Sequence, residues 1–332
     1  MNKIFMIDKV KRTGNFFVER TLPDLGEVFV KAGDSVEPFT KIGQAKVSYF
    51  FQKVPSGQEI LKEPNEYVEK GVLVSRVNKG QFKYTNFYAP YNGFLRPVGD
   101  GSFVFEQDKE KFELFSGAWG VVKSVVENKS VLISGSATVI YCAVASSYEA
   151  EGELVVLPNP TELLEDPYFA NFTKEVSGKI IYSGHFIKLE NLKRAIKIGV
   201  RGIIAGGFDK ESLDFAQKSG FALASISGFG RIPTPDQIFD FFSQVTNRYI
   251  FIRGPAGEIL IPSKDKFEEE SGDKDFLIEI KNDMIVQVLE RPYFGWIGSV
   301  KSVDKDRVKI AFPGRIEEVL VRPTNLLALD FF

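Results

Sequence analysis

The period of the hydrophobic pattern changes near residue 178, and this change limits the chain to folds that combine two kinds of module. Before it, short apolar runs are separated by glycine, proline and asparagine turns, which is typical of β-strands. After it, short apolar runs alternate with amphipathic stretches. Such β-α repetition predicts a small parallel sheet with right-handed crossovers. We therefore expect a mainly β, multi-domain chain with one small α/β module.

Individual elements of the α/β module can be placed from the pattern. Strands are expected over residues 179–182, 200–205 and 221–226, with helices over 189–198 and 211–218. A third helix is expected to begin at Thr234, with Thr234 as N-cap, Pro235 at the first helical position and Gln237 at the third. Residues 195–207 are similar to the small α/β modules called DRTGG domains, although the Asp-Arg-Thr of that family is missing.

The first part of the chain carries a glycine-turn pattern. A Gly33-Asp34 turn between two apolar runs is followed by Gly43, and an Ala89-Pro90 turn leads into a later strand. This spacing resembles the barrel-sandwich hybrid fold of lipoyl and biotinyl domains. In carrier domains of that fold a lysine bears the cofactor, but the nearest candidate here, Lys46, lacks the usual flanking residues. We therefore expect a structural module and no cofactor.

The last 50 residues resemble a KOW module, the SH3-like barrel of transcription elongation factors and ribosomal proteins. The resemblance rests on the Gly-x-x-Gly-x-Val turn at residues 295–300, the strand patterns around it and the closing Asn325-Leu326. It implies a domain that contacts RNA or protein. The order of modules as a whole resembles that of uncharacterised bacterial proteins.

These observations divide the chain into five segments. The expected segments are a barrel-sandwich-hybrid-like β domain over 1–116, a β segment and connection over 117–175, the α/β module over 176–262, a charged linker over 263–280 and the KOW-like barrel over 281–332. The apolar end, residues 326–332, is expected to be a last strand in a core, the other interpretation being an exposed patch that recruits another chain.

Charge argues against a polyanion as the main partner. The 42 basic and 44 acidic side chains leave a net charge of -2, so no global field attracts nucleic acid or an anionic membrane. The KOW-like segment is itself balanced, with seven basic and seven acidic residues over 283–332. A protein partner or self-association is therefore favoured over nucleic acid, which stays possible.

A reducing compartment suits this composition. The single cysteine, Cys142, cannot form an internal disulfide, and no apolar run approaches the roughly 20 residues of a membrane helix. We expect a cytoplasmic protein with no membrane span. Its partner-binding residues are expected among Tyr293, Phe294 and Trp296, which would suit either a protein contact or stacking on bases.

The strand ends of the α/β module suggest a ligand site, because loops leaving parallel strands converge at one edge of the sheet. Glycines there would let backbone amides approach a small anion, and an arginine would supply positive charge. The candidate residues are Gly184, His185, Gly206, Gly207, Ser227, Gly228, Gly230 and Arg231. The alternative interpretation is that these glycines are ordinary turn residues.

Catalytic signatures are missing from the sequence. It contains no Gly-x-Ser-x-Gly elbow, phosphate-binding loop or His-Glu-x-x-His, and a single histidine and cysteine exclude the common metal sites. No catalytic residue, metal or cofactor is predicted, although scattered carboxylates would leave no motif. We expect a non-catalytic scaffold protein that mediates assembly, the alternative being an RNA-, transcription- or translation-associated factor.

Limited proteolysis should cut the chain first between residues 264 and 275. Nine of these twelve residues are charged, and such a segment buries too little apolar surface to be ordered. Mass spectrometry of the first fragments would locate the cut. Early cleavage elsewhere, with this segment intact, would contradict the proposed boundary.

Overall fold

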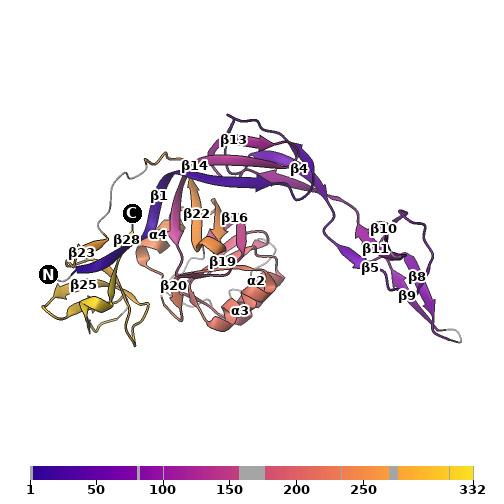
Figure 1. The fold of residues 1–332 in the computed structure, drawn as a ribbon. Coiled ribbons are helices and arrows are strands. Elements are labelled where there is room, and N and C mark those ends of the chain that lie inside the picture. Colours follow the sequence, from indigo (N-terminus) through magenta and orange to yellow (C-terminus); the bar gives the residue numbers. More distant parts are fainter. Residues whose placement is uncertain are drawn as a thin grey trace.

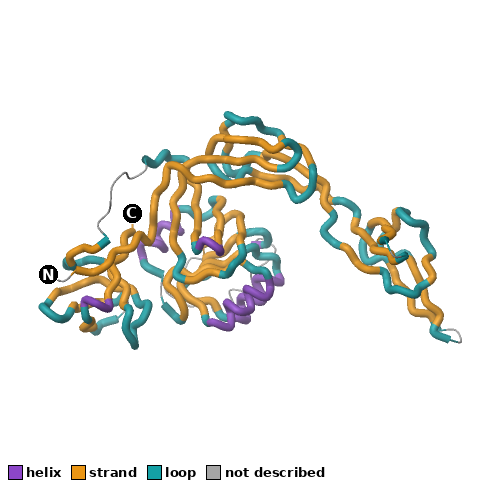
Figure 2. The backbone as a smooth tube through the Cα atoms, in the orientation of Figure 1, coloured by secondary structure: helices purple, strands orange, loops and turns teal. Residues whose placement is uncertain are grey.

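The computed structural model describes residues 3–80, 83–99, 101–156, 176–232, 234–268, 276–313 and 315–331. It is an elongated structure in which a β arm projects from a larger body (Figure 1). Three α-helices occur among the described residues, all in the body, and the arm consists of strands and loops (Figure 2). The prediction of a mainly β, multi-domain chain is confirmed. None of the described helices is long and apolar enough to cross a membrane.

Strand β1 (Lys3–Thr21) runs through two parts of the body. Its first half pairs in parallel with β28 (Leu326–Phe331), from Phe5 opposite Leu327 to Val10 opposite Phe331. Its second half pairs antiparallel with β14 (Ser130–Tyr141). The first strand of the chain therefore lies beside the last one, which confirms that residues 326–331 form a strand in a core.

The upper part of the body is a β structure built around β14. Strand β14 pairs with β1, with β13 (Gly120–Val126) and with β22 (Glu258–Ser263), which continues to β21 (Tyr249–Arg253) and β16 (Glu149–Val156). The short β3 (Ser35–Val36) extends β13. A second sheet contains β12 (Glu110–Phe115), β4 (Lys41–Val47) and β2 (Gly26–Val28). One core joins these two sheets and includes Phe16, Ile42, Leu114 and Ile133.

The arm, residues 48–109, has a core of its own. It contains a four-stranded sheet and a three-stranded sheet around a cluster that includes Val68, Val74, Leu95 and Phe105. The strands are β5 (Phe51–Lys53), β6 (Glu59–Ile60), β7 (Tyr67–Val68), β8 (Leu73–Asn78), β9 (Tyr84–Tyr88), β10 (Gly93–Val98) and β11 (Ser102–Gln107).

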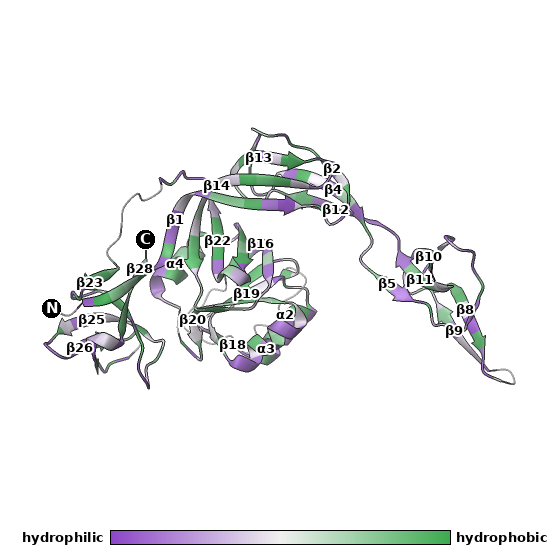
Figure 3. Ribbon diagram, viewed as in Figure 1, coloured by the Kyte–Doolittle hydropathy of each residue, from purple (hydrophilic) through white to green (hydrophobic). Residues whose placement is uncertain are grey.

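The α/β module has the expected parallel sheet. Strands β17 (Ile180–Tyr182), β18 (Phe186–Ile187), β19 (Gly202–Phe208) and β20 (Ala222–Phe229) are parallel, and β15 (Val144–Ala145) lies antiparallel to β20. Helices α2 (Leu189–Lys197) and α3 (Lys210–Ser219) carry hydrophilic residues on their outer surfaces (Figure 3). Leu192 and Ala216 face the core. Strands β17, β19 and β20 and helices α2 and α3 confirm the elements predicted between residues 178 and 229, whereas β15 and β18 were not predicted.

The third helix, α4 (Asp236–Gln244), begins later than the sequence predicts. Its cap is Pro235, and no side chain caps it. Thr234 is buried, and its hydroxyl accepts a hydrogen bond from the Tyr182 hydroxyl at 2.7 Å. The prediction that Thr234 is the N-cap was wrong because this buried partner engages the hydroxyl that a cap would use.

The C-terminal module is a small β structure. Its strands are β23 (Leu277–Glu279), β24 (Ile285–Val288), β25 (Ile297–Val303), β26 (Val308–Ala311), β27 (Val319–Val321) and β28. A 3-10 turn over Pro323–Asn325 precedes β28, and another over Gly254–Ala256 precedes β22 in the body. Its core contains Val286, Val300 and Ile310, and also Ile4 from β1.

The domain expected over residues 1–116 is divided in the structure. Ile4 belongs to the C-terminal core, Val10 to the core around α4, and Phe16 to the core of the upper sheets, whereas the arm has its own cluster. The ends of the expected linker 263–280 are also attached, since Ser263 ends β22 and residues 277–279 pair with β1. Residues 269–275 of that linker, and residues 157–175 of the expected connection, lie outside the described residues.

Replacing Ile4 with alanine should lower the free energy of unfolding of the C-terminal module by about 2–5 kcal/mol, because the side chain is buried in its core. Urea unfolding followed by the fluorescence of Trp296, in a chain whose other tryptophan is replaced (Trp119→Phe), would measure this change. The matched control is Phe5→Ala, on the next residue of β1, where the side chain is 64% exposed and the expected change is below about 0.5 kcal/mol. Equal effects of the two substitutions would contradict the role given to β1.

Candidate functional site

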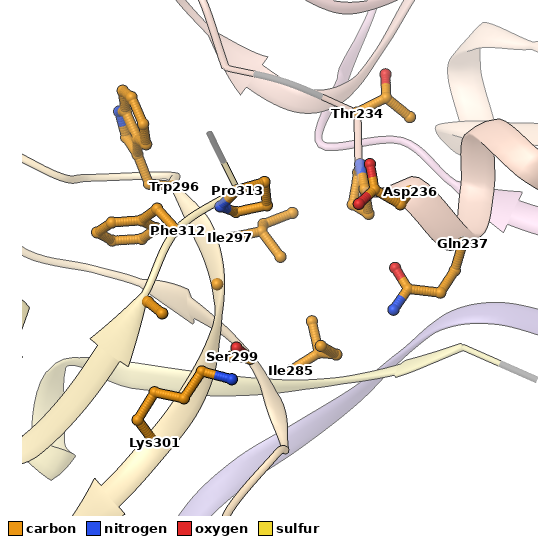
Figure 4. A pocket seen from close by; sticks show the side chains of 13 residues that line it. Thr234, Asp236, Gln237, Ile285, Trp296, Ile297, Ser299, Lys301, Phe312 and Pro313 are labelled. Carbon is orange, nitrogen blue, oxygen red and sulfur yellow. The ribbon is translucent and has the colours of Figure 1, made fainter. Parts of the chain in front are cut away.

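A cavity of about 310 Å³ lies between the start of α4 and the C-terminal module (Figure 4). We call it the junction cavity. One side comes from the α/β module and the other from β24, β25 and the segment after β26. It is lined by Thr234, Pro235, Asp236, Gln237, Ile285, Trp296, Ile297, Gly298, Ser299, Lys301, Ala311, Phe312 and Pro313.

The apolar wall of the junction cavity is an ordered aromatic cluster. The rings of Trp296 and Phe312 meet edge to face with centroids 5.4 Å apart, and Tyr293 packs against Phe312 at 5.4 Å. The guanidinium of Arg315 lies 4.3 Å from the centroid of the Trp296 ring. A cation over an aromatic face stabilises the ring in place, so this wall is built before any ligand arrives.

The polar lining comes from both modules. Asp236 and Gln237 occupy the first turn of α4, and Ser299 and Lys301 are on β25. In Figure 4 the Lys301 ammonium and the Gln237 amide both point toward the space between the modules. The Lys301 ammonium lies 3.7 Å from a carboxylate oxygen of Asp283, whose side chain is 85% exposed, and such a surface pair is weak.

His185 supports the turn that leads into α4. Its Nδ1 accepts the backbone N–H of Thr234 at 3.2 Å, so the neutral ring carries its proton on Nε2. Burial lowers the pKa of His185 below its ordinary value of 6.5, and the negative charge of Asp236 opposes that shift. The predicted ligand residue therefore acts on the junction cavity through the backbone of Thr234.

The glycines expected to bind an anion form hydrogen bonds between neighbouring segments of the sheet. The amides of Gly206, Gly207 and Gly230 donate to the carbonyl oxygens of Gly184, His185 and Phe208 at 2.8–2.9 Å. The amide of Gly228 donates to the Ser225 hydroxyl at 2.8 Å. A Cβ at Gly207 would overlap the carbonyl oxygen of Gly230. Four of the amides assigned to an anion are thus used within the chain, and these glycines allow strands to approach closely.

The two remaining candidates of that site, Arg231 and Ser227, also contact groups of the chain itself. The guanidinium of Arg231 lies 5.4 Å from the centroid of the Phe186 ring. Ser227 is buried, and its carbonyl oxygen lies 3.5 Å from Nε2 of Gln287 on β24, so it faces the C-terminal module. The structure places six of the eight predicted residues side by side through strand pairing, and His185 also contacts the segment that lines the junction cavity, so an anion site at these residues stays a prediction.

The predicted partner residues differ in exposure. Phe294 is 62% exposed, whereas Tyr293 and Trp296 are half-buried in the aromatic cluster. Only Phe294 of the three therefore presents most of its side chain to a partner.

The arm carries a set of exposed aromatic side chains. Six aromatic side chains there are 46–63% exposed: Tyr49, Phe50, Phe51, Tyr67, Tyr84 and Tyr88. Tyr84 and Tyr88 are on β9, an edge of the three-stranded sheet, and point to the same face because they are four residues apart. We call these six residues the arm aromatic surface.

The polar residues of the junction cavity on β25 were not recognised from the sequence. Ser299 alternates with buried Gly298 and Val300, so a period-2 pattern places it on the other face of the strand, whereas Lys301 lies at a register irregularity between Val300 and Ser302. That pattern identifies the face, but it does not show that α4 lies opposite.

Comparisons with known proteins do not assign the chain. No protein-family model matches it, and no curated protein matches it at a significant level. Among solved structures, the solution NMR structure of a UPF0107 protein is similar over 38% of this chain and 99% of its own length, with 17% identity and a TM-score of 0.26. A likeness at this level carries no inference about fold or function.

Lowering the pH below 6.5 should destabilise the α/β module through His185. Because the folded pKa is lowered, the unfolded chain binds more protons between the folded pKa and 6.5, so the free energy of unfolding falls as the pH drops through this window. Thermal unfolding at several pH values would measure the slope. In His185→Asn, whose side-chain oxygen can accept the Thr234 amide, this part of the slope should vanish, and an unchanged slope would contradict the assignment.

Proposed function

We propose that this chain is a non-catalytic scaffold protein that assembles with other protein chains through its small β modules. The observation that carries the proposal is the arm aromatic surface. The arm buries a complete core of its own, and yet six aromatic side chains stay on its outside. A module that needed only to be stable would not require them there.

Aromatic side chains at exposed positions favour protein contacts. They bury a large area with few rotatable bonds, and they are enriched among the residues that dominate binding energy. The edge strand β9 adds unpaired backbone groups next to Tyr84 and Tyr88, which a strand of a partner could use. The exposed aromatic rings and the backbone groups of the edge strand can both bind a protein partner without any net charge.

The charge of the arm supports a protein partner over nucleic acid. Residues 48–109 contain eight lysine and arginine residues and seven aspartate and glutamate residues, a net charge of +1. Some of the basic side chains are already paired, including Arg96 with Glu106 at 2.7 Å and Arg76 with Glu59 at 2.9 Å. Phosphate binding depends on several unopposed cations, and this surface offers few.

Replacing both Tyr84 and Tyr88 with serine should weaken assembly by at least about tenfold, because two aromatic anchors are lost. Light scattering on the protein purified from its host would give the mass of the assembly, and titration of the separated partner or of the chain itself would give its affinity. The matched control is Phe17→Ser, an aromatic residue of the body that is 47% exposed, which should leave assembly unchanged.

Two results would contradict the proposal. One is a strictly monomeric chain with no co-purifying protein. The other is binding to nucleic acid that weakens steeply with salt and is unchanged in the double variant, which would support the alternative function.

A further inference from the structure

The junction cavity combines features that a structural contact between two modules does not need. Its volume of about 310 Å³ is at the lower end of the range of about 300–1,000 Å³ typical of small-molecule pockets. Its lining combines an aromatic cluster of the C-terminal module with a few polar groups from both modules. This mixture is typical of sites that enclose an apolar body and fix its orientation through a small number of polar contacts.

The two charged residues of the cavity do not neutralise each other. Asp236 comes from α4 and Lys301 from β25, on opposite sides of the space in Figure 4. Among the described residues no ion pair joins them, and the charge of Asp236 also acts on His185, whose pKa it raises against the effect of burial. Lys301 has only the weak surface pair with Asp283 described above.

We propose that the junction cavity binds a small zwitterion of the free α-amino acid class with an apolar side chain. The ligand's ammonium group faces the Asp236 carboxylate, and its carboxylate faces the Lys301 ammonium. Hydrogen bonds between charged groups are the strong ones, and each contact here pairs opposite charges. The side chain of the ligand lies against Trp296, Phe312 and Ile297.

The charges decide between ligand classes. A simple anion would be attracted by Lys301 but repelled by Asp236, and a simple cation would experience the reverse. A ligand with one charge of each sign satisfies both residues at once. Gln237 and Ser299 add neutral groups that both donate and accept hydrogen bonds, so they suit either end of such a ligand.

Calorimetric titration of the full chain with L-leucine, L-methionine and L-phenylalanine tests this proposal. At least one of them should bind, and its N-acetyl derivative and its carboxamide should each bind roughly tenfold more weakly or worse, because each lacks one charge. The carboxamide also imitates the amino terminus of a peptide, so equal binding of the carboxamide would show that the carboxylate is not recognised and would overturn the proposal.

Substitutions of two exposed residues test which charge of the ligand each residue contacts. Asp236→Asn should weaken binding of the free amino acid roughly tenfold and leave binding of its N-acetyl derivative unchanged. Lys301→Gln should also weaken binding of the free amino acid roughly tenfold, and it should leave binding of the carboxamide unchanged. The matched controls are Asp240→Asn, one turn later on α4, and Lys309→Gln on the neighbouring strand β26, neither of which lines the cavity. Both controls should bind like the unaltered chain.

The proposal fails if none of the three amino acids binds, or if binding is the same in Asp236→Asn and Lys301→Gln as in their controls. This proposal does not depend on the scaffold function. The Tyr84 and Tyr88 substitutions should leave amino acid binding unchanged, and the Asp236 and Lys301 substitutions should leave assembly unchanged, so the failure of one proposal is distinguishable from the failure of the other.

Discussion

The pairing of β1 with two separate partners is the constraint on which the rest of the structure depends. Val10 is opposite Ile140 of β14 and also opposite Phe331 of β28, so one residue belongs to both ladders. Irregularities in register occur between Asp8 and Val10 and between Thr13 and Phe16, on either side of this point. Such bulges bend a strand and re-aim its side chains. They allow β1 to leave the C-terminal module and continue along β14.

Two buried charges fix the position of β1 against its surroundings. The ammonium of Lys9 donates to the carbonyl oxygen of Ile226 at 2.6 Å, and burial lowers the pKa of Lys9 to about 8. Arg20 pairs with Glu151 of β16 through two nitrogens, donates to the carbonyl oxygen of Phe115 at 3.0 Å and lies over the Phe251 ring. Buried charges are costly unless they are paired in one geometry. A shift of β1 by one residue would break the hydrogen bond of Lys9 and the ion pair of Arg20, so these contacts oppose other registers.

Local patterns predict local structure well in this chain, and they fail where the partner is distant in sequence. Three strands and two helices between residues 178 and 229 follow from the hydrophobic period, and the two-residue strand β18 is too short to show one. The sequence does not show that Ile4 belongs to a core made mostly of residues after 280, because the hydrophobic pattern of one strand does not indicate which strand it pairs with. Thr234 failed as a predicted cap for the same reason, since its competitor, Tyr182, is 52 residues away. The predicted glycine site shows a related limit: glycine permits close approach, but the sequence does not say whether a ligand or another strand approaches.

The position of the junction cavity follows from the same strand. Its two sides belong to the α/β module and to the C-terminal module, and β1 is hydrogen-bonded into the sheet on each side of Val10. The residues that line it on the C-terminal side are carried by β24 and β25, and β24 pairs with β28, the neighbour of β1. A rigid-body separation of the two modules would have to bend β1 near Val10 or break its ladder with β28. Because Val10 is itself buried in the core around α4, bending there would also disturb the helix that carries Asp236. Two kinds of contact therefore hold the modules beside the cavity, the continuous ladder of β1 and the direct contact between Gln287 and the Ser227 carbonyl oxygen.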